Sequence, residues 1–337
     1  MTQDLAQKAV IVAIGRNEGE RLKSCLRAAL AATQTVVYVD SGSSDGSAAF
    51  ARGLGCVVLE LTPPFSAARA RNEGFACVMK LNPKVPFVQF LDGDCELVKG
   101  WLDVGVATLA KQEHVAVVCG HVREVNPGGS VYTQLCNLEW QQTPGIILTS
   151  GGRFMIRTEV FTEVGGFREE VIAAEDDEFC VRVRRLGWKV MMVDAPMALH
   201  DANMLHFSEW WLRAFRTGHA YGHVAALHGK TDERYFVDDC RRIWIWGLIL
   251  PVTLLALAPF TMWVSAAILL GLYFVQFDKI YVRGRKRGWS RPDARVYAFF
   301  TVIGKFPMLE GLMAYHRRKW RGHSMTIIEY KRSSARS

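Results

Sequence analysis

The residues best suited to chemistry are two aspartates, Asp92 and Asp94, separated by a single glycine. They follow the apolar run 87–91, which has the length and composition of a buried strand. Two carboxylates at a strand end can bind Mg²⁺ or Mn²⁺, which prefer oxygen ligands and leave positions open for phosphate oxygens. We therefore predict a divalent-metal site at Asp92 and Asp94. His200, just past the last predicted strand, is a further candidate ligand, although a structural role is commoner for such a histidine.

Two other acidic features stand at the ends of predicted elements. Asp40 ends the apolar run 35–39 and precedes a segment rich in serine and glycine, so it could cap that turn or contact a nucleoside. Four consecutive acids, residues 175–178, begin an amphipathic segment that ends at Gly187. The helix dipole favours acids at such a start, but four exceed what capping needs. This helix start is therefore a second candidate for chemistry.

The first two hundred residues alternate apolar runs of strand length with amphipathic stretches of helix length. This alternation predicts an α/β fold with a largely parallel sheet, in which ligands bind at the strand ends. The expected strands are residues 8–14, 35–39, 56–61, 85–91, 115–122 and 189–193, and the expected helices are residues 21–32, 67–80, 101–111 and 176–186. Residues 154–157 and 159–164 are expected to be ordered segments, without an assignment to strand or helix. Between residues 126 and 150, prolines and glycines interrupt the pattern.

The C-terminal part of the chain contains an uncharged run of 35 residues, 243–277. A single membrane crossing needs only about 20. Basic residues flank both ends of the run, and the positive-inside rule favours keeping both flanks on one side, so we predict a hairpin. A third apolar stretch, 294–315, holds Lys305, Pro307 and Glu310 within its apolar face, and we predict an interfacial or re-entrant helix there.

The predicted elements divide the chain into three parts. Residues 1–200 form the expected catalytic domain. Residues 201–240 form an amphipathic segment whose aromatic and basic residues have a helical period, and this helix could pack on the domain or lie at a lipid interface. Residues 241–337 form the expected membrane region, which ends in a basic tail.

Charge and cysteine usage limit the partners and the compartment. The net charge is +8 at pH 7, and the positive charge clusters beside the uncharged run. This distribution favours anionic membrane lipid as a partner and argues against nucleic acid. The eight cysteines include no C-x-x-C pair, so we expect reduced thiols. The short apolar run near the N-terminus does not resemble a secretory signal, which predicts a cytoplasmic N-terminal part.

Five motifs, in order, resemble glycosyltransferase family 2 across about residues 8 to 195. They are Ile14-Gly15-Arg16-Asn17-Glu18, Val39-Asp40-Ser41-Gly42-Ser43, Ala70-Arg71-Asn72-Glu73-Gly74, Leu91-Asp92-Gly93-Asp94, and Gly151-Gly152 followed by Gly165-Gly166-Phe167 and Glu175-Asp176. The resemblance implies a GT-A fold and an inverting transfer of sugar from a nucleoside-diphosphate sugar donor. Arg16 replaces the tyrosine of the family's Pro-x-Tyr-Asn-Glu pattern. The Gln-x-x-Arg-Trp pattern of processive synthases is absent, which argues for addition of a single sugar.

The resemblance also implies a role for each matched residue. The residues expected around the nucleoside are Glu18, Asp40 and Arg71. Asp94 would bind the metal directly, and Asp92 would hold the ribose and support the metal site. Asp176 would be the general base, since crowding by neighbouring acids raises the pKa of a carboxyl group.

The leading hypothesis is a metal-dependent glycosyltransferase on the cytoplasmic face of the inner (cytoplasmic) membrane. Its acceptor would be a lipid-linked or cell-surface saccharide, and a polyprenyl-linked acceptor suits the basic and tryptophan-rich segments. One alternative is a nucleotidyltransferase that uses the same carboxylates and metal, although the first strand leads to no glycine-rich phosphate loop. The other is a catalytically inactive membrane scaffold, which predicts broken metal carboxylates, whereas both are present.

Overall fold

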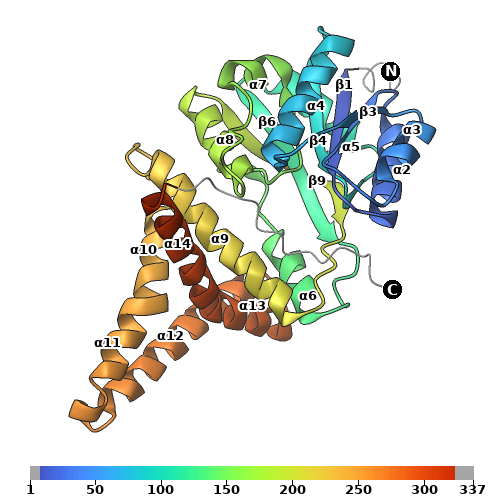
Figure 1. Cartoon of the computed structure of the whole chain (residues 1–337). Coiled ribbons are helices and arrows are strands. Elements are labelled where there is room, and N and C mark those ends of the chain that lie inside the picture. Colours follow the sequence, from blue (N-terminus) through green and yellow to red (C-terminus); the bar gives the residue numbers. More distant parts are fainter. Residues whose placement is uncertain (1–7, 323–337) are drawn as a thin grey trace. The chain divides into compact units, whose positions relative to one another are not determined.

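The computed structural model describes residues 8–322 and divides them into two compact units (Figure 1). The first unit contains residues up to 126 and residues 140–202. Of the described residues, the second contains 127–139 and 203–322. Most of the predicted basic tail lies outside the described residues.

The first unit is built on a mixed nine-stranded sheet. Its strands are β1 (Ala9–Gly15), β2 (Val36–Asp40), β3 (Val57–Glu60), β4 (Phe87–Asp92), β5 (Cys95–Leu97), β6 (Val115–Glu124), β7 (Gly145–Ile147), β8 (Phe154–Arg157) and β9 (Lys189–His200). Their order is β3-β2-β1-β4-β8-β6-β9-β5, and β7 pairs with β9. The first four strands in this order are parallel, so the carboxyl ends of β1, β2 and β4 meet at one edge. The α/β class predicted from the sequence is confirmed.

Helices cover both faces of this sheet. They are α2 (Glu20–Ala32), α3 (Ser47–Gly53), α4 (Ala67–Leu81), α5 (Trp101–Lys111), α7 (Thr158–Val164) and α8 (Glu175–Arg185). Phenylalanine rings join α4, α7 and α8 to one face, because Phe161 of α7 packs against Phe90 of β4, Phe75 of α4 and Phe179 of α8. Burying each ring contributes about 1.5–3 kcal/mol.

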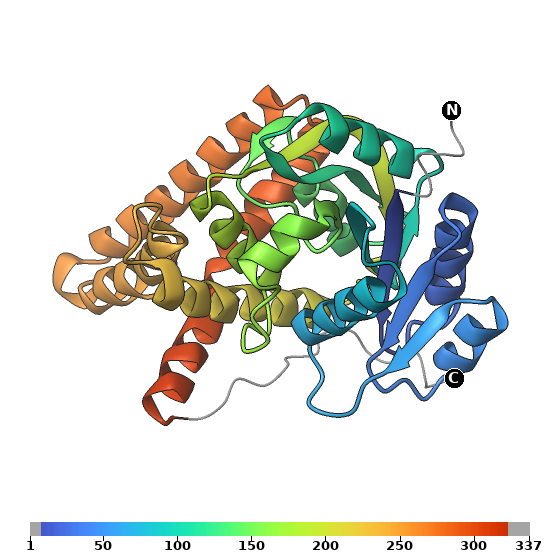
Figure 2. The same ribbon diagram turned by 90° about the horizontal axis from the view of Figure 1, so that it is seen from above.

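The opposite face of the sheet carries α5. The Nε1 of Trp101 donates to Oε1 of Gln89 at 2.7 Å. Gln89 precedes Phe90 in β4, and successive strand residues point to opposite faces. Figure 2 shows α4 and α5 on either side of the strands.

Several elements differ from the sequence prediction. The short elements α3, β5 and β7 were not predicted, and two larger differences have a physical reason. The interrupted region contains α6 (Val131–Glu139), where Gln134 Nε2 donates to Asp293 Oδ1 at 2.6 Å. This helix therefore takes its partners from the C-terminal helices, a tertiary contact that local proline and glycine signals do not reveal. Strand β9 continues beyond the predicted residue 193 to His200, because Pro196 is accommodated where its pairing with β6 is irregular.

The second unit consists of helices. They are α6, α9 (Phe207–His228), α10 (Val237–Trp244), the π-helical η1 (Ile245–Ile249), α11 (Leu250–Ala256), the 3₁₀ turn η2 (Pro259–Thr261), α12 (Val264–Lys286), α13 (Arg291–Ile303) and α14 (Lys305–Trp320). The helix predicted within residues 201–240 is present as α9. It packs closely on α14, since a Cβ at Gly218 would lie 1.9 Å from the carbonyl oxygen of Met308. Trp211 Nε1 donates to Glu310 at 3.1 Å, which gives this acid a partner within an apolar stretch.

The uncharged run folds as a helical hairpin. Its first arm is α10, η1 and α11, and its second arm is α12, which lies beside α11 (Figure 1). Ser265 Oγ donates to the carbonyl of Leu254 at 2.7 Å, and the Tyr273 hydroxyl donates to the carbonyl of Trp246. The carbonyl of Trp246 is open to the Tyr273 hydroxyl because of Pro251. In a π-helical turn this carbonyl would accept from the N–H of residue 251, and proline has no N–H.

Two helical runs in the described part of the chain are long and apolar enough to cross a membrane. By length and composition they are Val264–Lys286 and Arg291–Trp320. The second run includes the stretch that the sequence predicts to be interfacial, and Gly304 separates its two helices, α13 and α14. The C-terminal helices are therefore apolar enough to associate with a membrane.

Candidate active site

The two aspartates of the D-x-D motif flank the tight turn between β4 and β5. The N–H of Gly93 donates to the carbonyl of Ile14 at 2.7 Å, and a Cβ at Gly93 would lie 3.1 Å from that oxygen. Glycine therefore lets this turn close on the end of β1. The side chain of Asp92 is 27% exposed, whereas Asp94 is buried.

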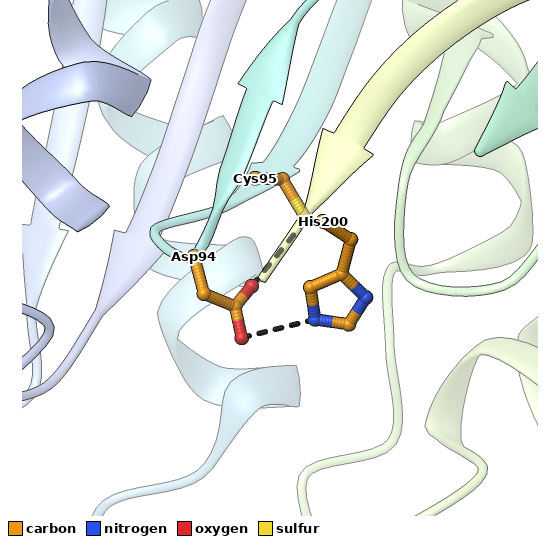
Figure 3. A group of neighbouring side chains, drawn as sticks. All are labelled: Asp94, Cys95 and His200. Atoms are coloured by element: carbon orange, nitrogen blue, oxygen red, sulfur yellow. Dashed lines mark hydrogen bonds and ion pairs between the residues drawn. The ribbon is translucent and has the colours of Figure 1, made fainter. Parts of the chain in front are cut away.

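Asp94 lies in a cluster with Cys95 and His200 (Figure 3). The pairing of β5 with β9 places Cys95 opposite His200. His200 Nε2 lies 3.1 Å from Asp94 Oδ2, and Cys95 Sγ donates to Asp94 Oδ1 at 3.4 Å. One candidate ligand atom from each of the three residues lies within 4.8 Å of the others. The structure thus brings two predicted metal ligands together, Asp94 and His200.

The thiol of Cys95 is not suited to hold a hard cation. Burial, and then the charge of Asp94, raise its pKa well above the usual value. The sulfur therefore keeps its proton and acts as a hydrogen-bond donor. The chemically suitable donors in the cluster are the carboxylate of Asp94 and the imidazole of His200.

Arg153, whose side chain is 12% exposed, adds a cation to this cluster and was not predicted. Its Nη1 lies 3.0 Å from Nδ1 of His200, 3.7 Å from Sγ of Cys95 and 3.8 Å from Oδ2 of Asp92. The guanidinium stands over the indole of Trp140, 5.8 Å from the ring centroid, and the same indole stacks on His200 at 4.4 Å. The sequence signal that could have found Arg153 is its position directly after the matched Gly151-Gly152 motif.

Arg71 links the metal-site turn to the acidic helix start. It is buried on α4, where Nη2 lies 2.7 Å from Oδ1 of Asp92 and Nη1 lies 2.7 Å from Oε1 of Glu175. Both terminal nitrogens are therefore occupied by carboxylates of the protein. Glu175, for which the sequence analysis predicts no individual role, completes this bridge. A contact of Arg71 with the nucleoside stays a prediction.

Gly152 is needed for Arg71 to make this bridge. A Cβ at Gly152 would lie 2.4 Å from Nη2 of Arg71, which its two ion pairs hold in place. We expect Gly152→Ala to break the contact with Asp92 and lower stability by about 1–3 kcal/mol, as overpacking does. Thermal unfolding of the full chain in detergent would measure this loss.

The matched control for this substitution is Gly53→Ala. Nothing lies within 4 Å of a Cβ at Gly53, at the end of α3 in the same unit. It should leave the melting temperature unchanged or raise it slightly, because alanine lowers the entropy of the unfolded chain. An unchanged melting temperature for Gly152→Ala would contradict the tight packing of Arg71.

Asp176 stands in the first turn of α8, beside Glu175. Burial, and then the charge of Glu175, raise the pKa of Asp176 to about 6, although Arg71 and Arg153 oppose the shift. Such a carboxylate is ionised at neutral pH and more basic than an ordinary aspartate, as a general base requires. A Cβ at Gly151 would lie 3.9 Å from Oδ2 of Asp176 and 3.5 Å from Nη2 of Arg153. Gly151 therefore lies close to both side chains.

Asp40 and Glu18 lie at the ends of β2 and β1. Asp40 is buried and accepts hydrogen bonds from the Tyr38 hydroxyl at 2.8 Å and from the Ser43 N–H at 2.7 Å. Its two oxygens therefore cap the turn that follows β2. Glu18 pairs with Arg21 at 2.7 Å. Contacts of both acids with a nucleoside stay predictions.

The model of glycosyl transferase family 2 matches residues 10–168, the stretch that carries four of the five motifs and the first part of the fifth. Residues 10–168 therefore have the sequence pattern of glycosyl transferase family 2. Over 252 residues it is 27% identical to the glycosyltransferase AglE of Haloferax volcanii, and the match covers 70% of this chain and 80% of AglE. The protein is therefore a glycosyltransferase, which sets aside the nucleotidyltransferase and scaffold alternatives.

Solved structures of similar fold include two complexes with nucleotide sugars. The mannosyltransferase PcManGT from Pyrobaculum calidifontis, in complex with GDP-Man and Mn²⁺, is 16% identical, with a TM-score of 0.63 over 93% of this chain and 88% of its own. S. aureus TarS 1–349, in complex with UDP-GlcNAc, is 16% identical, with a TM-score of 0.52 over 94% and 93%. The GT-A fold implied by the sequence motifs is thus confirmed.

Proposed function

We propose that this enzyme transfers a single sugar, with inversion, from a nucleoside-diphosphate sugar to a lipid-linked or cell-surface saccharide. The observation that carries the proposal is the place of Asp176 in the first turn of α8, where burial and the charge of Glu175 raise the pKa of its carboxyl to about 6. Glu175, its neighbour, is joined through Arg71 to Asp92. The likeness to the complexes with GDP-Man and UDP-GlcNAc supports a nucleotide-sugar donor.

In the proposed reaction Asp176 takes the proton of the acceptor hydroxyl as that oxygen attacks the anomeric carbon. A hydroxyl is a weak nucleophile until a base accepts its proton. One attack in line with the departing diphosphate inverts the configuration at that carbon. Arg71 orients Asp92 and Glu175 by its two ion pairs, and Arg153 supplies positive charge where the diphosphate leaves.

We also propose that the enzyme depends on Mg²⁺ or Mn²⁺. Asp94 would hold the ion directly, Asp92 would hold the ribose and support the metal site, and His200 would be a further ligand. The oxygen and nitrogen donors near Asp94 fit such an ion, and the complex of the mannosyltransferase contains Mn²⁺. A divalent cation neutralises the charge of a leaving diphosphate.

The remaining nucleoside contacts follow the sequence prediction. Glu18, Asp40 and Arg71 would lie around the nucleoside. Two hydrogen bonds from backbone N–H groups to side chains support a preformed edge there. The Asn17 N–H donates to Ser43 Oγ at 2.9 Å, and the Ser44 N–H donates to Asn17 Oδ1 at 2.8 Å. These two bonds tie the loop after β1 to the loop after β2.

Product analysis of the full chain with a panel of nucleotide sugars tests the proposed reaction. With a polyprenyl-linked saccharide as acceptor, one donor should release its nucleoside diphosphate only when acceptor is present. The product should carry one additional sugar with inverted anomeric configuration by NMR. Release of pyrophosphate would identify nucleotidyl transfer, and retained configuration would exclude Asp176 as the base of a single displacement.

We propose that residues 1–200 form the catalytic domain, residues 201–240 an amphipathic segment and residues 241–337 a membrane region. The membrane region would attach the protein to the inner membrane, with the catalytic domain facing the cytoplasm. Phe260, Met262 and Trp263, around the hairpin turn, are 85%, 89% and 68% exposed. Such a surface is costly in water and suits lipid. A polyprenyl-linked acceptor would then be presented beside the enzyme.

The hairpin predicts that both of its basic flanks stay in the cytoplasm. From Arg242 to Leu257 the first arm rises about 22 Å, less than the roughly 30 Å of a bilayer core. Cysteines placed at the exposed positions Lys230 and Lys286 should therefore resist an impermeant maleimide in intact cells. One at Phe260 should resist it too, because the turn stays within the hydrocarbon.

The background for this labelling experiment needs few changes. Six native cysteines are buried, and only Cys77 and Cys240 are half-buried. After replacement of those two by serine, lysis of the cells should make positions 230 and 286 reactive, which shows that each cysteine can be labelled. Labelling of one of them in intact cells would establish a single crossing and overturn the hairpin.

A further inference from the structure

The contact between Arg153 and His200 fixes the position of the imidazole proton. A guanidinium carries only hydrogen-bond donors. Nη1 of Arg153 lies 3.0 Å from Nδ1 of His200, so Nδ1 accepts this bond and carries no hydrogen. In a neutral ring the proton is then on Nε2.

This tautomer directs the proton of His200 at the proposed metal ligand. Nε2 lies 3.1 Å from Oδ2 of Asp94 and donates to it (Figure 3). A ring nitrogen that bears a proton has no lone pair for a cation. In the described arrangement His200 is therefore a donor to Asp94, and the other oxygen of Asp94 accepts from Cys95.

The surroundings of Arg153 hold this arrangement. Its side chain is 12% exposed and stands over Trp140, the ring that also stacks on His200. Its charge faces Asp92 at 3.8 Å. A guanidinium does not lose its proton in a protein, so only its movement can release Nδ1.

We propose that Arg153 gates the metal site and is released by the diphosphate of the donor. A diphosphate oxygen offers the guanidinium a stronger, bidentate partner than a ring nitrogen. When Arg153 turns to it, the proton of His200 passes through solvent from Nε2 to Nδ1, with no change in charge. Nε2 then presents its lone pair to the cation beside Asp94. This inference rests on the proposed donor and metal, and it gives Arg153 a second role beside its contact with the diphosphate, which is to set the tautomer of His200.

Binding of Mn²⁺ without any nucleotide tests the gate. Mn²⁺ alone is titrated into the purified full chain, and free Mn²⁺ is measured by electron paramagnetic resonance. Arg153→Met removes the donor to Nδ1, and we expect it to bind Mn²⁺ about tenfold more tightly than the wild type, the usual effect of such outer partners. Loss of folding would weaken binding, so a gain in affinity cannot come from a structural defect.

Two further variants separate the gate from simple loss of charge. In the double variant Arg153→Met/His200→Phe, a phenyl ring without ligand atoms replaces the imidazole of His200. The affinity for Mn²⁺ should then return to about the wild-type value. Arg123→Met is a control that removes an exposed arginine of β6. Arg123 precedes Glu124, which pairs with His200 in the sheet, and the variant should leave the affinity for Mn²⁺ unchanged. Equal or weaker binding by Arg153→Met, or a gain kept by the double variant or shared by Arg123→Met, would overturn the gate.

The same measurement distinguishes the gate from the proposed function. UDP or GDP should tighten Mn²⁺ binding more in the wild type than in Arg153→Met, in which His200 is already released. An equal effect in both proteins would overturn the gate. Sugar transfer by the wild type with all divalent cations chelated would instead contradict the proposed metal dependence.

Discussion

Asp94→Ala is expected to abolish sugar transfer and the metal-dependent part of donor binding. Asp94 is buried between Cys95 and His200, and its carboxylate is the oxygen donor of the proposed site. Asp92 cannot replace it, because Oδ1 of Asp92 is held by Arg71 and a divalent cation needs several oxygen ligands. Turnover at saturating donor and Mn²⁺, and donor titration with and without Mn²⁺, would measure both losses.

Asp194→Ala is the matched control for this variant. Asp194 lies on β9, as His200 does, but its side chain is 85% exposed. In the described part of the chain its ion pair is with His121. Removing an exposed pair costs at most about 1 kcal/mol, so turnover should stay close to that of the wild type. Most activity retained by Asp94→Ala in the presence of Mn²⁺ would sink the metal assignment.

The sequence predicts elements best where one periodicity dominates. Residues 101–111 are predicted as a helix with the bounds that α5 has, and residues 154–157 are predicted as an ordered segment with the bounds that β8 has. Both are short segments whose apolar residues face the core, so pattern and tertiary structure agree. Helix α6 was missed because its bonds are made to residues such as Asp293, far along the chain.

In the candidate site, too, residues in local motifs can be placed from the sequence, whereas residues that depend on tertiary contacts cannot. Asp92 and Asp94 could be placed from sequence, because a strand end and a two-carboxylate motif are local features. The roles of Arg153 and Trp140 could not, since they depend on the pairing of β5 with β9, which brings His200 beside Cys95. The bridge of Arg71 to Glu175 likewise joins side chains 104 positions apart.

Asp176→Asn is expected to lower kcat while leaving donor affinity nearly intact. The asparagine keeps the shape of the side chain but cannot accept the proton of the acceptor hydroxyl. Loss of a general base costs about two to four orders of magnitude in rate. Turnover with saturating acceptor, together with a donor titration on the same preparation, would separate the effect on kcat from the effect on binding.

The pH dependence of kcat gives the same substitution a second readout. The reaction needs the ionised carboxylate, and the pKa of Asp176 is raised to about 6. In the wild type kcat should therefore fall as the pH drops through about 6, and the residual rate of Asp176→Asn should lack this limb.

Asp177→Asn is the matched control, because it removes the same charge one residue further along the same turn of α8. The neighbouring residue points about 100° away around a helix, so Asp177 cannot take the place of Asp176. Its kcat should stay within about threefold of the wild type, and its acidic limb should remain. If Asp176→Asn instead loses donor affinity at unchanged kcat, Asp176 binds the donor. The base would then have to be sought among the other carboxylates near Arg71.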